Sequence, residues 1–162
     1  MTGRRSRLLG AVWAGLASIM AGGCAAYISP LQPPPYRDQI AAPYDVTWNA
    51  LIRALAFDNV PLRAVAKDSG VIASDDIVSP IGVYADCGSK GDTPLEGEAL
   101  VTFTVFVRPN GATTDLQINS KMRTFRLGKP GSRLRPDPNY ECVSTTRWEP
   151  NLVDSVRRLV KE

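Results

Sequence analysis

The stretch ALVTFTVFVRPNGATTDLQINSKMR, residues 99–123, places two alternating segments on either side of a turn. In the first segment, every second residue from Ala99 to Val107 is apolar, which is the period of a strand with one buried face. Pro109-Asn110-Gly111 supplies a tight turn. The return segment carries only polar or charged residues on one face, and on the other Leu116, Ile118, Ser120 and Met122. The stretch predicts an antiparallel hairpin whose second face meets water or a polar partner.

A helix is predicted before this hairpin, with Asp45 as its N-cap and its end near Phe57. Its apolar stripe has the spacing i, i+3, i+4 and i+7 and consists of Trp48, Leu51, Ile52 and Leu55.

A second amphipathic helix is predicted at the end of the chain, where one face holds Leu152, Val153, Val156, Leu159 and Val160. Thr146 with Glu149 matches a capping box, and Pro150 also allows a later start. Trp48 and Trp148, at the starts of the two helices, are predicted to pack in the core.

The remaining segments complete an α+β fold. Residues 60–67 and 71–78 are β-prone runs joined by Asp68-Ser69-Gly70, and they predict a hairpin. Residues 79–97 predict a long loop, residues 126–139 a second loop, and residues 140–142 a short fifth strand. The predicted order is α-β-β-β-β-(β)-α, with an antiparallel sheet of four to five strands flanked by an N-terminal and a C-terminal helix.

The first residues have the pattern of an export signal. Arg4, Arg5 and Arg7 precede an apolar run over residues 8–22 that is too short to span a bilayer comfortably. Ala21-Gly22-Gly23-Cys24 resembles the lipobox of bacterial lipoproteins, which implies a signal peptide over residues 1–23 and lipid on Cys24. An ordinary secretory signal cleaved near Ala25 or Ala26 is the alternative. By resemblance to lipoprotein sorting signals, the absence of Asp after Cys24 implies the outer membrane, with the domain facing the periplasm.

Residues 24–43 carry Pro30, Pro33, Pro34 and Pro35 and predict an extended tether. About 20 such residues at about 3.1 Å each would reach some 60 Å from the membrane. The folded unit is then expected over residues 44–162, as a single domain.

Charge excludes one class of partner. The chain has 19 basic and 16 acidic side chains, but three of the basic ones lie in the signal segment, so the rest balances. We therefore expect no nucleic-acid binding. Within the balanced domain, one local excess of positive charge could face anionic lipid, lipopolysaccharide or an acidic protein, or be a solvated surface: Lys121, Arg123, Arg126, Lys129, Arg133 and Arg135.

The three cysteines divide into a lipidated Cys24 and an even pair, Cys87 and Cys142. In an oxidising periplasm the pair is expected to form a disulfide. A metal pair and free thiols are the alternatives, but without histidine a zinc site has little support.

Enzymatic chemistry has few candidate residues. Without histidine there is no histidine-based triad or imidazole acid–base catalysis. Asp75-Asp76 is the best carboxylate pair, but adjacent strand residues point to opposite faces. We therefore expect no catalytic residues, no metal and no cofactor.

Short motifs carry a resemblance to the helix-grip domains of Gram-negative lipoproteins, above all the BamC family of the outer-membrane β-barrel assembly machine. The motifs are Tyr44-Asp45-Val46-Thr47-Trp48, Lys67-Asp68-Ser69-Gly70-Val71-Ile72, and Ser144-Thr145-Thr146 with Trp148-Glu149. The resemblance covers about the last three-quarters of the chain and implies fold and location, with no catalytic residues to carry over. BamC carries two such domains, whereas this chain has room for one.

Two functions follow as hypotheses. The first is a non-enzymatic envelope lipoprotein with a protein-binding or scaffold domain, of use in outer-membrane assembly or maintenance. The alternative is a module that holds an apolar or anionic envelope ligand between sheet and C-terminal helix. A deep pocket lined by Leu116, Ile118, Val156 and Val160 would favour the alternative, and a packed core would oppose it.

Overall fold

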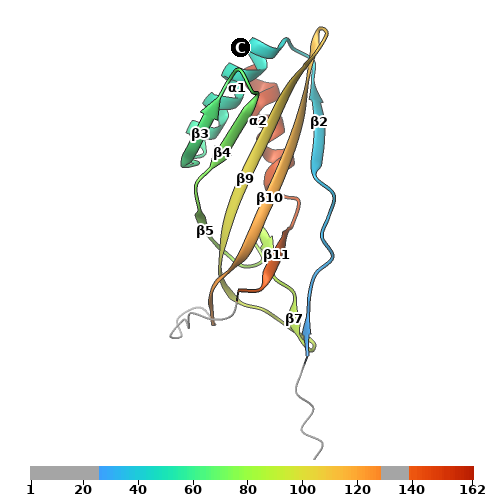
Figure 1. Ribbon diagram of the computed structural model, residues 1–162, viewed down its shortest axis with the longest axis vertical. Helices are drawn as coiled ribbons and strands as arrows, with labels where there is room; N and C mark the ends of the chain where they lie inside the picture. Colours follow the sequence, from blue (N-terminus) through green and yellow to red (C-terminus); the bar gives the residue numbers. More distant parts are fainter. Residues whose placement is uncertain (1–25, 129–138) are drawn as a thin grey trace, which may run out of the picture.

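The computed structural model describes residues 26–128 and 139–162, and these form an α+β fold (Figure 1). The predicted α+β class is confirmed. Within the described residues the main sheet has eight strands rather than four or five, and a second, small sheet has three. The additional strands come from segments that the sequence analysis treated as tether and loop.

The described elements are two helices, a hairpin of two long strands, and several short strands. The strands before the hairpin are β1 (Tyr27–Ile28), β2 (Tyr36–Ile40), β3 (Leu62–Ala66), β4 (Val71–Ser74), β5 (Ile77–Pro80), β6 (Ala85–Asp86), β7 (Ser89–Lys90) and β8 (Thr93–Pro94). The others are α1 (Tyr44–Phe57), β9 (Gly97–Asn110), β10 (Thr113–Leu127), β11 (Glu141–Ser144) and α2 (Trp148–Leu159). The main sheet runs β3-β4-β9-β10-β11-β6, with β2 paired to β10 and β5 to β9, and the small sheet runs β1-β7-β8.

The hairpin of β9 and β10 is the centre of the sheet, as predicted. Its register is regular from Asn110↔Thr113 to Ala99↔Thr124, and the turn consists of Gly111 and Ala112, slightly later than predicted. Gly111 has φ +62°, which glycine adopts without strain. The predicted inner face is buried, and it includes Ala99, Val101, Phe103, Val105, Val107, Leu116, Ile118 and Met122.

Helix α1 ends at Phe57 as predicted but begins one residue before Asp45. The N-cap position is Pro43, whose carbonyl accepts a hydrogen bond from the Thr47 amide, and no side chain in the described part of the chain caps the helix. The predicted Asp45 cap is therefore wrong, and Asp45 instead forms an exposed ion pair with Lys67 at 2.8 Å. Trp48 is buried in the core as predicted.

Helix α2 also begins without the predicted capping box. Arg147 is the N-cap residue, and none of the described side chains caps the helix. The Thr146 amide donates to Ser144 Oγ at 2.9 Å, while the carboxylate of Glu149 accepts from Ser120 of the sheet. Trp148 is buried as predicted and stacks on Phe103 with 3.6 Å between ring centroids.

The predicted hairpin over residues 60–78 is confirmed for β3 and β4. At its turn Gly70 has φ +65°, and a Cβ there would lie 2.1 Å from the carbonyl oxygen of Val107. The second run is interrupted at Asp75-Asp76, so that β4 and β5 pair with β9 separately and with a one-residue change in register. Ser74 Oγ accepts the Phe103 amide at 2.8 Å near this break.

The expected tether over residues 24–43 differs from the structure. Residues 36–40 form β2, which pairs with β10 from Tyr36↔Ile118 to Ile40↔Thr114. Tyr27 and Ile28 form β1 and pair with β7. The described part of the tether is thus extended, but it lies along the domain, and the folded unit begins before residue 44.

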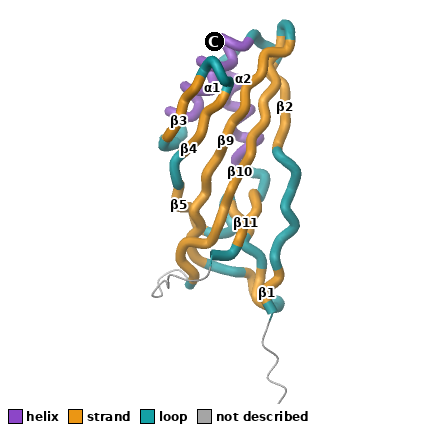
Figure 2. Tube along the Cα trace, in the orientation of Figure 1, coloured by secondary structure: helices purple, strands orange, loops and turns teal. Residues whose placement is uncertain are grey.

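The helices cover only part of the sheet (Figures 1 and 2). Strands of 14 and 15 residues are about 46–50 Å long, whereas helices of 14 and 12 residues are about 21 and 18 Å long. Both helices pack on one face near the β9–β10 turn. The other end of the sheet, where β1, β7 and β11 lie, needs a different support.

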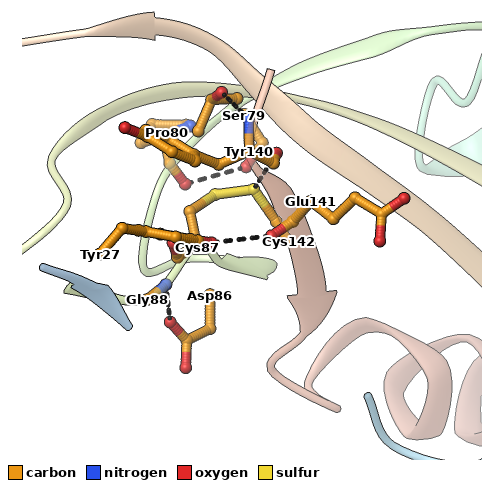
Figure 3. The surroundings of a disulfide bond; sticks show 10 residues. Tyr27, Ser79, Pro80, Asp86, Cys87, Gly88, Tyr140, Glu141 and Cys142 are labelled. Atoms are coloured by element: carbon orange, nitrogen blue, oxygen red, sulfur yellow. Dashed lines mark hydrogen bonds between the residues drawn. A yellow bond between two sulfur atoms is a disulfide. The ribbon is translucent and has the colours of Figure 1, made fainter. Parts of the chain in front are cut away.

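The Cys87–Cys142 disulfide supplies that support (Figure 3). Both cysteines are buried, and Cys142 lies in β11 opposite Met122. The Tyr27 hydroxyl donates to the carbonyl of Cys87 at 3.1 Å, and its ring stacks on Tyr140 at 4.1 Å. The predicted disulfide is confirmed, and the residues around it also hold the beginning of the described chain. We call this region the disulfide end.

Candidate functional site

The sheet face opposite the helices, which we call the open face, is uncovered in the described residues (Figure 2). The β10 side chains on it are those of the predicted polar face. Asp115 accepts from Gln39 Nε2 at 2.8 Å and from Asn110 Nδ2 at 3.0 Å. Gln117 accepts from Arg37 Nε at 3.2 Å. Because both Asp115 oxygens are engaged, this row is suited to presenting fixed polar groups rather than to acid–base catalysis.

An apolar strip lies beside the polar row on the open face. The register of β4, β5 and β9 places Val71 opposite Phe106 and Val78 opposite Leu100, all on the side away from the core. Val78 is 52% exposed, and the other three are partly buried. A hollow of about 600 Å³ lies between Phe106 of this strip and the polar row, and it does not extend to Val78 or Leu100. Apolar surface next to fixed hydrogen-bonding groups is the usual composition of a protein interface.

The predicted basic patch is only partly within the described residues. Lys129, Arg133 and Arg135 lie outside them, while Lys121, Arg123 and Arg126 are exposed on β10. Arg123 pairs with Asp76 at 3.6 Å, and Arg126 pairs with Glu98 at 3.5 Å. These ion pairs are about half exposed, so each contributes about 0–1 kcal/mol, but they balance much of the charge. Asp76 belongs to the pair considered for catalysis, and here it serves as a counter-ion.

The pocket that would favour the alternative function is filled by side chains. Leu116, Ile118 and Val156 are each at most 2% exposed and belong to the core, and Val160 packs against it. The space between the sheet and α2 at these residues is therefore a packed core, which argues against a ligand held there.

A groove of about 520 Å³ lies at the edge of β10, beside the start of α2. Its walls include Pro33, Pro34, Pro35 and Tyr36, and its far side includes Ser144 and Thr146. Continuing the β2 register would place Pro35 opposite Asn119 and Pro34 opposite Ser120. Proline has no amide hydrogen to donate, so the ladder stops at Tyr36. Farther along the same edge of β10, the pairing with β11 begins only at Met122. The described strands therefore leave this edge unpaired between the two ladders.

Glu149 lines this groove and is the buried carboxylate of the site. It is 2% exposed, and its Oε1 accepts from Ser120 Oγ at 2.7 Å. Its Oε2 is buried and has no hydrogen-bond partner among the residues that the structure describes. This position of Glu149 was not predicted from the sequence, although the sequence contains a signal for it. Glu149 precedes Leu152, Val153 and Val156 by three, four and seven residues, so it belongs to the apolar stripe of α2.

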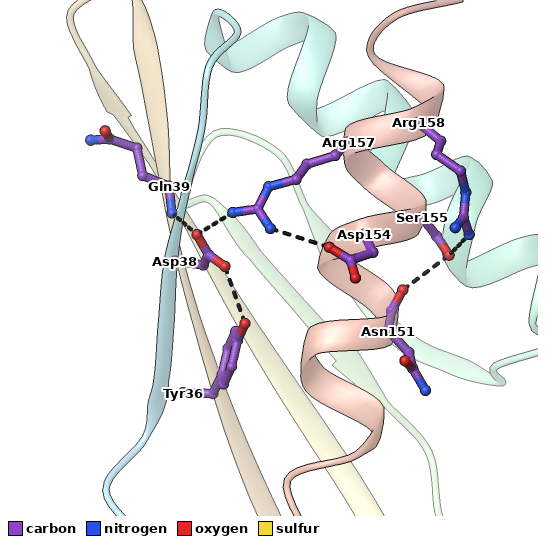
Figure 4. Close-up of polar contacts among 8 residues, drawn as sticks. All are labelled: Tyr36, Asp38, Gln39, Asn151, Asp154, Ser155, Arg157 and Arg158. Atoms are coloured by element: carbon purple, nitrogen blue, oxygen red, sulfur yellow. Dashed lines mark hydrogen bonds and ion pairs between the residues drawn. The ribbon is translucent and has the colours of Figure 1, made fainter.

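Polar contacts fix β2 against α2 beside the groove (Figure 4). Arg157 Nη2 donates to Asp38, and Arg157 Nη1 donates to Asp154 at 3.2 Å. The Tyr36 hydroxyl donates to the other Asp38 oxygen at 3.1 Å. Burial and this hydrogen bond to Asp38 raise the pKa of Tyr36 above 10. These contacts hold the wall of the groove in place.

Comparison with solved structures finds a similarity to a DUF4468 family protein from Bacteroides ovatus. The two chains are 14% identical, and the match covers 78% of this chain and 77% of that chain with a TM-score of 0.36. No protein-family model matches the chain, and no curated protein does.

Among residues 26–128 and 139–162, we find no helix with the length and apolar character needed to cross a membrane. The same residues contain no group of three or more cysteine and acidic side chains placed to bind a metal ion.

Proposed function

We propose that this chain is a non-enzymatic envelope lipoprotein, anchored by lipid on Cys24, whose domain binds another protein through its open face. The observation that carries the proposal is the uncovered face itself, with an apolar strip beside fixed polar groups. A sheet face left without a helix layer normally meets water and is polar throughout. The strip of Val71, Val78, Leu100 and Phe106 departs from that rule, and a protein partner would cover it.

The proposed location is the periplasmic side of the outer membrane, and outer-membrane assembly or maintenance is the proposed process. The proposal rests on the lipobox resemblance of residues 21–24 and on the resemblance to BamC-like helix-grip domains. The α+β class and the helices on one face are compatible with a helix-grip arrangement.

The anchor and the disulfide end are close along the chain. Only Ala25 separates Cys24 from Ala26, whose carbonyl accepts the Gly91 amide at 3.0 Å. Two extended residues span at most about 7 Å. A lipid on Cys24 would therefore hold the disulfide end against the bilayer, with the long strands projecting from it. This geometry replaces the long free tether that the prolines suggested.

Membrane fractionation of the wild type and Cys24→Ala tests the anchor. The wild type should sediment with outer membranes and the variant should be released. If both fractionate alike, the chain is an ordinary secreted domain and the anchor proposal fails.

Spin labels test the proposed orientation. Nickel-chelating lipids should broaden the EPR spectrum of a nitroxide at Ser29. They should not broaden that of a nitroxide at Ala112, about 45 Å away along the hairpin. Equal broadening would contradict the proposed orientation.

Photocrosslinking in cells tests the open face. A benzophenone amino acid at Thr104, in the middle of the open face, is compared with one at Ala56, which is exposed on α1. Thr104 should capture one predominant protein, identified by mass spectrometry, and Val78→Glu should reduce that capture. Barrel-assembly subunits in this product would identify the process. Equal capture at Ala56, or none at Thr104, would contradict the proposal.

A further inference from the structure

We infer that the groove beside β10 is a binding site for an alkylammonium group, with Glu149 as its anionic acceptor. The groove and the buried carboxylate are independent observations that meet at one place. The ammonium could belong to a lysine side chain of a bound polypeptide or to a small free amine. The lysine source rests on the proposed protein-binding function, whereas the ammonium site itself does not.

The Glu149 carboxylate has unsatisfied hydrogen-bonding capacity. A buried carboxylate is costly unless hydrogen bonds satisfy its oxygens. Ser120 satisfies Oε1, whereas no group within residues 26–128 and 139–162 satisfies Oε2, which is removed from solvent. Ser120 and Glu149 both line the groove, so in our proposal the donor approaches this carboxylate from the groove. The missing partner is therefore one that a ligand can supply.

The walls decide which kind of donor fits. Pro33, Pro34 and Pro35 have apolar rings, and Tyr36 adds an aromatic ring. These walls suit a methylene stem, and the tyrosine ring also attracts a cation. A charged N–H donor makes a stronger hydrogen bond to carboxylate than a neutral one. An ammonium on an aliphatic stem combines these requirements, and a lysine side chain is the polypeptide group with that structure.

Three other polar side chains that line the groove already make hydrogen bonds, those of Ser144, Asn119 and Arg37. Ser144 Oγ accepts the Thr146 amide, and Asn119 Oδ1 accepts from Gln117 Nε2 at 3.0 Å. Arg37 also lines the groove, and its Nε donates to Gln117. Its positive charge opposes an ammonium, so the site contains one residue that favours binding and one that weakens it. The two residues give variants with opposite expected effects.

The test is an NMR titration of the full 162-residue chain, kept soluble in nonionic detergent at constant ionic strength. The probe is n-butylammonium chloride, compared with 1-butanol and with n-butyltrimethylammonium chloride, which has charge but no N–H donor. Butylammonium should shift the amide resonances of Ser120 and Thr146 with a Kd of about 1–10 mM, the range open to a ligand of five heavy atoms. The other two probes should bind about tenfold more weakly.

The variants separate the site from nonspecific binding. Glu149→Gln keeps the size and the Ser120 contact and should weaken butylammonium about tenfold, to the level of butanol. Arg37→Gln, at an exposed position, should tighten butylammonium about threefold and remains informative if Glu149→Gln does not fold. Glu96→Gln, an exposed glutamate outside the groove, should change nothing. The inference is overturned if Glu149→Gln binds like the wild type, or if Arg37→Gln has no effect.

A second arm identifies the source of the ammonium. Nα-acetyl-lysine-methylamide should bind at least as tightly as butylammonium if the groove receives a lysine of a polypeptide. Binding of butylammonium alone would assign the site to small amines and reject the lysine source. Neither result depends on photocrosslinking at Thr104, so failure of the ammonium site and failure of the protein-binding proposal can be told apart.

Discussion

Removing the disulfide should cost this domain a large part of its stability. Cys87 and Cys142 are 55 positions apart in sequence. For a loop of that length, the chain-entropy model gives about 4 kcal/mol of stabilisation through the unfolded state. Because single domains have unfolding free energies of about 5–15 kcal/mol, the replacement of both cysteines by alanine should leave a marginal protein.

Urea denaturation followed by tryptophan fluorescence measures this loss. The double alanine variant should lose about 4 kcal/mol, and its m-value should rise because the unfolded chain is no longer crosslinked. Hydrogen exchange gives the location of the effect. Protection should fall first in β6 and β11, which the helices do not cover, while the β9–β10 turn end should keep its order of protection.

A matched control separates the crosslink from packing. Val143→Ala changes a buried residue beside Cys142 in β11 but keeps the disulfide, and it should cost about 1–2 kcal/mol. Both variants must be compared under the same buffer and temperature. A loss in the double variant no larger than that of Val143→Ala would refute the reasoning, because it would mean that the disulfide constrains nothing that the fold does not already hold.

Three further predictions concern single positions. Gly70→Ala should lower the urea midpoint by an amount equivalent to about 2 kcal/mol or more, because φ is +65° and the new Cβ would lie 2.1 Å from Val107 O. A neutral effect would contradict that geometry. Pro35→Val should let β2 extend by one ladder position opposite Asn119, which hydrogen exchange would detect as new protection at the groove. Unchanged protection would show that the prolines do not end the ladder. The difference between ultraviolet titrations of the wild type and Tyr36→Phe should have its midpoint above pH 10, because burial and the hydrogen bond to the neighbouring aspartate raise this pKa. Stability from this group is complete below pH 10 and is lost as the pH rises through the higher value, so a midpoint at or below 10 would contradict the assignment.

The central hairpin could be predicted because its signal is local. Each inward residue from Ala99 to Val107 is apolar, and the predicted turn, Pro109-Asn110-Gly111, overlaps the observed turn at Gly111. The same holds for α1 and α2, whose apolar stripes follow the helical period. The disulfide could be predicted because Cys87 and Cys142 were the two cysteines left once Cys24 was assigned to lipidation.

The short strands could not be predicted in this way, since their pairing depends on distant residues. In β2, Asp38 points toward the helices, and a charged residue on an inner face argues against a strand in a sequence pattern. Its ion-pair partner is Arg157, which lies 119 positions later in the chain. The turn-rich segment from β6 to β8 pairs in strands of only two residues. Such strands carry too few residues for a period to be visible.

The predicted N-caps of both helices were wrong for a related reason. The predicted caps at Asp45 and Thr146 assumed that local hydrogen bonds dominate. In the structure, Asp45 pairs with Lys67 of the hairpin turn, and Glu149 bonds to Ser120 of the sheet. In both cases the side chain that a local capping motif would have used binds a residue distant in sequence.

Glu149 links the two parts of the candidate site. An apolar residue at this position would continue the stripe of Leu152, Val153 and Val156 and would leave no oxygen unpaired. The chain instead has a carboxylate there, at a point where three prolines keep the neighbouring strand from closing the edge of the sheet. Each feature alone lowers stability, because one leaves an acceptor unsatisfied and the other leaves a ladder incomplete. Departures from local consistency concentrate at functional sites. Two such departures at one groove therefore favour a binding role for Glu149 over a purely structural one.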